Sequence, residues 1–371
     1  MVRSPSILAT ALLALCACAG EPRTAPSGQG ATATGSLSIS ATPIQIIAPV
    51  DSDGVPVLGN IADATRLSSG LIAVVDRSVH AVLFIDSKGA LLGQSGRSGD
   101  GPGEFRSVAG IGQCAPDTLF VWDRMNDRMS LLDATGALLR SYRLPGNPVD
   151  RFCAGSAQYL VWTSLSTNGS PTADSPPIRG TALLVSPNGD SVGGLGDVQA
   201  GQIWPLGAVT QFAVADAGIY MGTADTAVVS LYGRSGQKLR SVDVGDARRT
   251  TTAAEYDAAL TSLINTVPGT AEQIASMREF MVKRFSMPKY LPAYRAIFTN
   301  GNGALFVVTS PLGDGITELH AFDQRGANIG EVRIPDDLEV FEIGTDYLLG
   351  MLADAEGEQR LVVYSLRIGG R

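Results

Sequence analysis

Apolar residues recur along the chain in a fixed order: an apolar strand, a short polar loop, a second apolar strand, a tight glycine turn and a final strand. Measured between their glycines, successive turns are 47, 53, 47 and 90 residues apart. Glycine suits this place because such a hairpin commonly puts one residue at positive φ, where a side chain is strained. The five turns are Asp86–Gly89, Asp133–Gly136, Ser186–Gly189, Gly233–Gly236 and Asp323–Gly326.

An earlier apolar strand precedes each turn, and a sixth such strand follows the last turn. The six are Leu71–Val75, Leu119–Trp122, Tyr159–Trp162, Ile219–Met221, Leu305–Val308 and Tyr347–Leu352. Units of about 40 to 50 residues with four short strands are typical of propeller blades. An α/β repeat would need a helix in every unit, and only one unit has a helical pattern. We therefore expect an all-β fold, a six-bladed β-propeller over residues 37–371.

The doubled spacing is explained by residues Thr250–Met287, where the apolar period changes from two to about 3.6. Pro268 and Gly269 interrupt the pattern, and Thr270 with Gln273 fits a capping box before a second helix. We expect a two-helix insertion between blades four and five, with its apolar faces packed on the propeller. The apolar positions are Tyr256, Leu260, Leu263, Ile264 and Val267 in the first helix and Ile274, Met277, Met281 and Phe285 in the second.

The last unit lacks a glycine turn and a fourth strand after Leu361–Leu366. The pattern of the segment Leu37–Ile47, before the first unit, predicts a strand without a hairpin partner of its own. Pairing the two would close the ring and remove two exposed edges at once.

The residues before the repeat indicate export. Arg3 and the short apolar run Ile7–Leu15 resemble a secretory signal. The cysteines that follow resemble a bacterial lipobox, and Cys18 is the expected lipidation site, which makes residues 1–17 the signal peptide. Cys16 fits less well because a leucine precedes it. The alternative is an ordinary cleaved signal. We expect a protein anchored by lipid to the bacterial cell envelope, and sorting to the outer membrane is consistent with the residues after Cys18.

Residues 18–36 are rich in Ser, Thr, Pro, Gly and Ala, which predicts a flexible tether. Over the whole chain, 44% of residues are apolar and 17% charged, enough for a substantial core. Removing the signal takes away one basic residue, Arg3, and no acidic one, so the formal net charge of −8 becomes −9. This charge disfavours nucleic acid and anionic lipid as partners. We expect a monomer that meets the membrane through its lipid anchor.

Export also makes a disulfide between Cys114 and Cys153 possible, because disulfides persist outside the cytoplasm. Both lie a few residues before the second strand of adjacent units. We expect a disulfide that joins these two blades. The alternative is a pair of buried free thiols.

The segment Gly93–Phe105, followed by Leu119–Asp123 and Arg128, resembles the NHL-repeat proteins and related bacterial six-bladed propellers. The match is best over residues 71–145. The resemblance implies a six-bladed ring used mostly for recognition, in a family that also includes lyases and lactonase-like enzymes. Likeness of fold alone transfers no activity.

Connections in a four-stranded antiparallel blade alternate between two faces. One face would carry the glycine-rich loop Gly96–Phe105, the long loop Ser164–Arg179 and the helical insertion. Function concentrates on long loops over a rigid scaffold, so this is the expected binding face. Its charged candidates, on this loop or directly after it, are Arg97, Asp100, Glu104 and Arg106. We expect a recognition module for a protein, peptide or glycan; the alternatives are a propeller enzyme of the lyase or lactonase-like class and a structural envelope component.

The sequence gives little sign of catalysis or of a cofactor. No helix or GK[ST] motif follows the glycine-rich loop, so a turn between blades is favoured over a phosphate cradle. His80 and His320 are the two histidines, too few for a multi-histidine metal centre. No cofactor or metal ligand is predicted, although calcium on Asp and Asn oxygens stays open. We expect solvated strand-end residues or caps at Asp76, Asp123 and Asp127.

Overall fold

The computed structural model describes residues 37–50, 57–144, 148–153, 159–164, 178–186, 190–200, 206–245, 248–265, 269–284, 286–313, 315–354 and 356–369. They belong to one compact unit, Thr32–Arg371. The predicted signal peptide, Cys18 and the tether lie outside the described residues.

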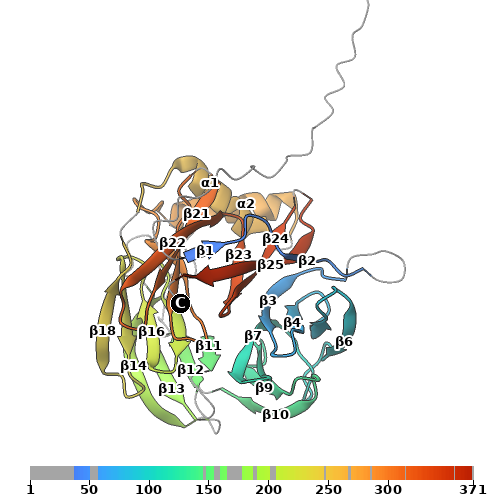
Figure 1. The fold of residues 1–371 in the computed structure, drawn as a ribbon. Helices are drawn as coiled ribbons and strands as arrows, with labels where there is room; N and C mark the ends of the chain where they lie inside the picture. Colours follow the sequence, from blue (N-terminus) through green and yellow to red (C-terminus); the bar gives the residue numbers. More distant parts are fainter. Residues whose placement is uncertain are drawn as a thin grey trace, which may run out of the picture. The chain divides into compact units, whose positions relative to one another are not determined.

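Five antiparallel sheets of four strands follow one another along the chain (Figure 1). In each of them every strand pairs with the next strand in sequence. Blade one is β3 (Ile61–Arg66), β4 (Ile72–Asp76), β5 (Ala81–Ile85) and β6 (Leu91–Ser95), and blade two is β7 (Val108–Ala115), β8 (Thr118–Asp123), β9 (Arg128–Leu132) and β10 (Leu138–Arg143).

The other three blades repeat this order. Blade three is β11 (Pro148–Cys153), β12 (Tyr159–Ser164), β13 (Ile178–Val185) and β14 (Ser191–Ala200). Blade four is β15 (Gln211–Ala215), β16 (Gly218–Gly222), β17 (Val228–Tyr232) and β18 (Lys238–Asp243). Blade five is β19 (Tyr294–Thr299), β20 (Leu305–Thr309), β21 (Ile316–Phe322) and β22 (Asn328–Pro335).

The expectation of six such blades is wrong: the described residues form five four-stranded blades and one sheet of a different kind. This closing sheet has five strands, and β25 pairs with three of them. Its members are β23 (Glu339–Ile343), β24 (Tyr347–Ala353), β25 (Gln359–Ile368), β1 (Leu37–Ile39) and β2 (Gln45–Ile47). The reason is that the last unit supplies three strands without a further hairpin, and a segment from the other end of the chain covers β25.

The predicted pairing of Leu37–Ile47 with the last unit is confirmed. Leu37 lies opposite Ile368 and Ile47 opposite Leu361, both antiparallel. The segment pairs as two short strands instead of one because the residues between them leave the ladder. The pairing buries Leu37 and Ile47 almost completely, so it adds apolar contact as well as backbone hydrogen bonds.

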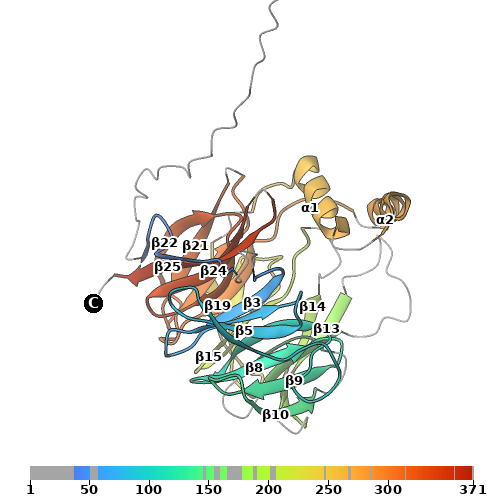
Figure 2. The same cartoon turned by 90° about the vertical axis from the view of Figure 1, so that its right-hand side faces the viewer.

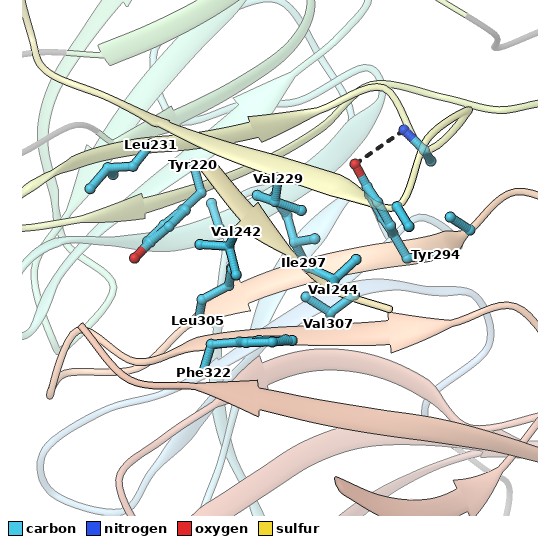
Figure 3. Packing of buried hydrophobic residues seen from close by; sticks show 14 of the residues in the cluster. Tyr220, Val229, Leu231, Val242, Val244, Tyr294, Ile297, Leu305, Val307 and Phe322 are labelled. Carbon is cyan, nitrogen blue, oxygen red and sulfur yellow. Dashed lines mark hydrogen bonds between the residues drawn. The ribbon is translucent and has the colours of Figure 1, made fainter. Parts of the chain in front are cut away.

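The first strands of the six sheets contact one another in a closed cycle: β3, β7, β11, β15, β19, β23 and β3 again. We call them the inner strands. The second strands are the most apolar, and all five residues of β4 and of β20 are buried, as expected for strands covered on both faces. The fourth strands β6, β10 and β18 are mostly exposed. Figure 3 shows how Val229 and Val242 of blade four meet Leu305 and Val307 of blade five.

The helical insertion contains α1 (Ala253–Asn265) and α2 (Ala271–Arg284), which lie against each other (Figure 2). The predicted capping box is confirmed, because the Thr270 N–H donates to the Gln273 side chain and the Gln273 N–H to the Thr270 hydroxyl. Packing is uneven. Leu260 of α1 is fully buried, whereas Met277 of α2 is 37% exposed. The expected burial of both apolar faces therefore holds for Leu260 and Ile264 of α1, whereas Ile274 and Met281 of α2 are only half-buried. Val267 and Phe285 lie outside the described residues.

Candidate functional site

Two buried aspartates organise one end of the first two blades. Asp76 ends β4, Asp123 ends β8, and neither is exposed to solvent. Each carboxylate accepts hydrogen bonds from two backbone N–H groups just before the inner strand of its own blade. The donors are Gly59 and Asn60 for Asp76, at 2.7 and 3.2 Å, and Arg106 and Ser107 for Asp123, both at 3.0 Å. Both aspartates are therefore caps, as predicted, but they are not solvated.

An arginine follows each buried aspartate. The backbone N–H of Arg77 donates to the Asn60 carbonyl, and that of Arg124 to the Ser107 carbonyl, each at 2.9 Å. Arg77 therefore lies at the start of β3 and Arg124 at the start of β7. Both side chains are exposed, and within the described residues neither guanidinium makes a hydrogen bond or an ion pair.

Two further charges stand at the starts of neighbouring inner strands. Arg295, near the start of β19, is half-buried and donates to the carbonyls of Asp336, at 2.6 Å, and Leu338, at 3.1 Å. Burial lowers the pKa of Arg295, and the nearby carboxylates of Asp336 and Glu339 oppose this. Glu339, the first residue of β23, has its pKa raised by burial, while Arg77 and Arg295 act in the opposite direction.

These four residues lie at the starts of four consecutive inner strands, β19, β23, β3 and β7, which contact one another in that order. We call Arg295, Glu339, Arg77 and Arg124 the axial arc. Three of its members are cationic and one is anionic. The end of the ring that carries the arc is named the loop face. Sequence reasoning missed the arc, although the Asp-Arg pair repeats 47 residues apart, at Asp76 and Asp123.

The glycine-rich loop Gly96–Phe105 lies in the connection between β6 and β7, residues 96–107, on the loop face. The structure brings its four predicted binding residues together but pairs them with one another. Arg97 lies 2.7 Å from the Glu104 carboxylate, and Arg106 forms an ion pair with Asp100. A hydrogen bond from the Gly101 N–H, with the Arg97 pair, lowers the pKa of Glu104. The hydrogen bond from Arg106 lowers the pKa of Asp100.

Two side chains hold this loop from its inner side. Phe105 is completely buried, and a β-carbon at Gly96, where φ is 97°, would overlap the Phe105 ring. Arg128, whose side chain is 12% exposed, donates to the carbonyls of Asp100, at 2.6 Å, and Glu104. The loop is thus a fixed part of the scaffold.

The insertion is tied to the same face. Arg248 donates to the Asp225 carbonyl in the β16–β17 loop at 2.5 Å, and Arg249 donates to the Pro311 carbonyl in the β20–β21 loop at 2.9 Å. Arg249 also forms a bidentate ion pair with Glu255, which lowers the pKa of Glu255 to about 2. Most of the third predicted feature of this face, the loop Ser164–Arg179, lies outside the described residues.

The remaining candidates lie elsewhere. Cys153 ends β11 and is disulfide-bonded, and Cys114 lies in β7, an inner strand that contacts β11. Pairing of the two stays a prediction. His320 is buried, with its ring nitrogens 3.2 Å from the Val244 carbonyl and 3.1 Å from Glu318. Among the residues that the structure describes, no three His, Cys, Asp or Glu side chains are grouped so that they could hold a metal ion.

No protein-family profile and no curated protein matches the sequence. Solved structures do. A putative exported protein from Bacteroides fragilis has 14% identity and a TM-score of 0.53, with 90% of this chain and 96% of that chain covered. A member of the DUF4221 family from Bacteroides vulgatus has 11% identity and a TM-score of 0.53, with 91% and 99% covered.

A virginiamycin B lyase from Staphylococcus aureus has 9% identity and a TM-score of 0.43, with 90% of this chain and 100% of that chain covered, which is too remote to carry an argument. Across the part of the chain described, neither helix has the length and apolar character needed to cross a membrane. The similar structures are β-propeller proteins, and the likeness shows that this chain shares their fold.

Proposed function

We propose that the protein is an exported, lipid-anchored binding module that recognises a protein, peptide or glycan with its loop face. The observation that carries the proposal is the axial arc, in which Arg77 and Arg124 project from fixed turns with exposed guanidinium groups that make no hydrogen bond or ion pair among the described residues. Because the backbone of these turns is already fixed, it loses little further conformational freedom when the side chains it carries bind a partner. The arc therefore suits recognition better than the mutually paired charges of the glycine-rich loop.

Export and anchoring belong to the same proposal. One structure that shares the fold is described as a putative exported protein, and the first residues of this chain resemble a lipoprotein signal. Labelling cells with an alkyne fatty acid tests the anchor. We expect the label on the wild-type protein and on Cys16→Ala, and its loss from Cys18→Ala. Equal labelling of Cys18→Ala and the wild type would refute lipidation at Cys18.

A pair of photo-crosslinking variants tests the binding face. Met125, beside Arg124, is 67% exposed on the loop face, and Lys88 is exposed in the β5–β6 hairpin turn, at the other end of its blade. A photoreactive amino acid would replace each in turn, in the full-length protein in its own cells. We expect a discrete crosslinked product from position 125 and none from position 88. Products from position 88 alone, or from neither, would contradict the proposal, and the latter result favours a structural component.

A further inference from the structure

We infer that the axial arc is a subsite for an oxyanion, a carboxylate or phosphate group of the recognised ligand. The inference rests on the proposed function and adds the chemistry of the ligand. Arginine presents a planar fork of N–H donors that matches two oxygens of a carboxylate or a phosphate. Arg77 and Arg124 offer such forks at equivalent places of adjacent blades.

The local balance of charge supports an anionic guest. The chain carries a formal net charge of −8, yet the arc has three arginines and one carboxylate. Glu339 interacts with both Arg77 and Arg295, and Asp336 and Asp337 act on Arg295 as well, so the carboxylates of this end lie near these two arginines. Arg124 has no ion pair within the described residues. An added oxyanion would supply the missing negative charge.

Arg295 gives a second, independent observation. Its guanidinium is half-buried and its two hydrogen bonds go to backbone carbonyls, not to a carboxylate. Carbonyl dipoles orient the group, and the nearby carboxylates of Asp336 and Glu339 offset only part of the unfavourable effect of its burial, which still lowers the pKa of Arg295. A bound anion nearby would reduce that cost. The guanidinium of Arg295 is thus fixed by two carbonyls, and binding of an anion beside it would require no movement of this side chain.

The turns that carry Arg77 and Arg124 are fixed before any ligand arrives. Asp76 accepts hydrogen bonds from Gly59, Asn60 and Ser78, and Asp123 from Arg106, Ser107 and Asn126. Both aspartates are fully buried, and their carboxylates already accept these hydrogen bonds. They therefore do not pair with the exposed arginines that follow them. The same device therefore places an exposed cation at the start of two adjacent inner strands.

Arginine Nε–Hε resonances test the inference directly in the full-length protein, purified in detergent and labelled with ¹⁵N-arginine. Sodium phosphate and sodium succinate would be titrated separately at constant ionic strength, with signals assigned from Arg77→Lys and Arg124→Lys. Arg325, exposed in the hairpin turn of blade five, is the control. We expect saturable shifts for Arg77 and Arg124 and none for Arg325. The probe that saturates first identifies phosphate or carboxylate as the preferred group.

The double variant Arg77→Gln/Arg124→Gln should weaken binding of that probe at least tenfold, whereas Arg325→Gln should leave it unchanged. Both changes are at exposed side chains, and an unaltered melting temperature would show that the fold is intact. Absence of saturable shifts with both probes, or equal shifts at Arg325, would overturn the inference. In that case crosslinking from position 125 would still support the proposed function, so the two ideas can fail separately.

Discussion

The glycine-rich loop and the helical insertion both belong to the loop face, but they are fixed in different ways. The loop is held from inside by Phe105, Arg128 and the capping carboxylate of Asp123, all buried or nearly so. The insertion is held at its first residues by Arg248 and Arg249 and then by the apolar side chains of α1. Its second helix keeps 55% of Phe280 exposed.

The difference shows where the rigidity of this face originates. Buried polar contacts fix the backbone beside Arg124, so the position of this cation is set by the blade itself. The insertion contributes surface without comparable anchoring. We therefore expect stability to respond strongly to changes under the loop, moderately to changes in α1 and weakly to changes in α2 or in the surface ion pairs.

The largest effect is expected for Asp123→Ala. The change leaves the N–H groups of Arg106 and Ser107 without their acceptor and removes the carboxylate 3.6 Å from the Arg128 guanidinium. Breaking a buried, hydrogen-bonded charge pair costs about 3 to 5 kcal/mol. Denaturant unfolding followed by circular dichroism measures this. Asp100→Ala, which removes an exposed pair on the same loop, is the matched control, and equal losses for the two would contradict the role given to burial.

The next effect separates the two helices of the insertion. Leu260→Ala removes a fully buried side chain and should lower the free energy of unfolding by about 2 to 4 kcal/mol. Met277→Ala, in the neighbouring helix, should change it by less than about 0.5 kcal/mol because that side chain is 37% exposed. The same unfolding measurement compares them. A large loss for Met277→Ala would mean that α2 is anchored as firmly as α1.

Much of the fold could be predicted from the sequence because repeats constrain one another. The glycine turns, the apolar second strands and the change of period at Thr250 are local signals, and each led to a correct element. The number of four-stranded blades was predicted wrongly because the last unit was counted as a blade although it supplies three strands, and its outer position is filled by β1 and β2. That pairing joins residues more than 300 positions apart, and no local signal reports its detailed register.

The candidate site was harder to predict. Charged residues on a glycine-rich loop suggested binding, but Arg97 and Arg106 find carboxylates within the same loop. Arg77 and Arg124 could have been found from the repeated Asp-Arg pair after the second strand. Arg295 and Glu339 carry no such signal, and only closure of the ring brings the start of β23 beside the start of β3, where Arg77 lies.

A smaller effect is expected from the cap of α1. The Glu255 carboxylate pairs with Arg249 and caps the helix through Thr252, which lowers its pKa from the ordinary 4.5 to about 2. Because the folded pKa is the lower one, this stabilisation is present above about pH 4.5 and is lost as the pH falls towards 2. Since the pair is partly exposed, we expect about 1 kcal/mol. The difference in unfolding free energy between wild type and Glu255→Gln should shrink across that range; a constant difference would contradict the assignment.

The smallest effect, and the one that most directly tests the comparison, is expected for Arg97→Ala. Its side chain is 78% exposed, and its partner Glu104 keeps a hydrogen bond from the Gly101 N–H when the arginine is removed. Exposed ion pairs contribute little to stability, so we expect no measurable loss in denaturant unfolding. A loss as large as that of Asp123→Ala would show that surface pairs hold the loop. The buried contacts of Asp123 and Arg128 could then no longer be the reason that Arg124 is fixed in place.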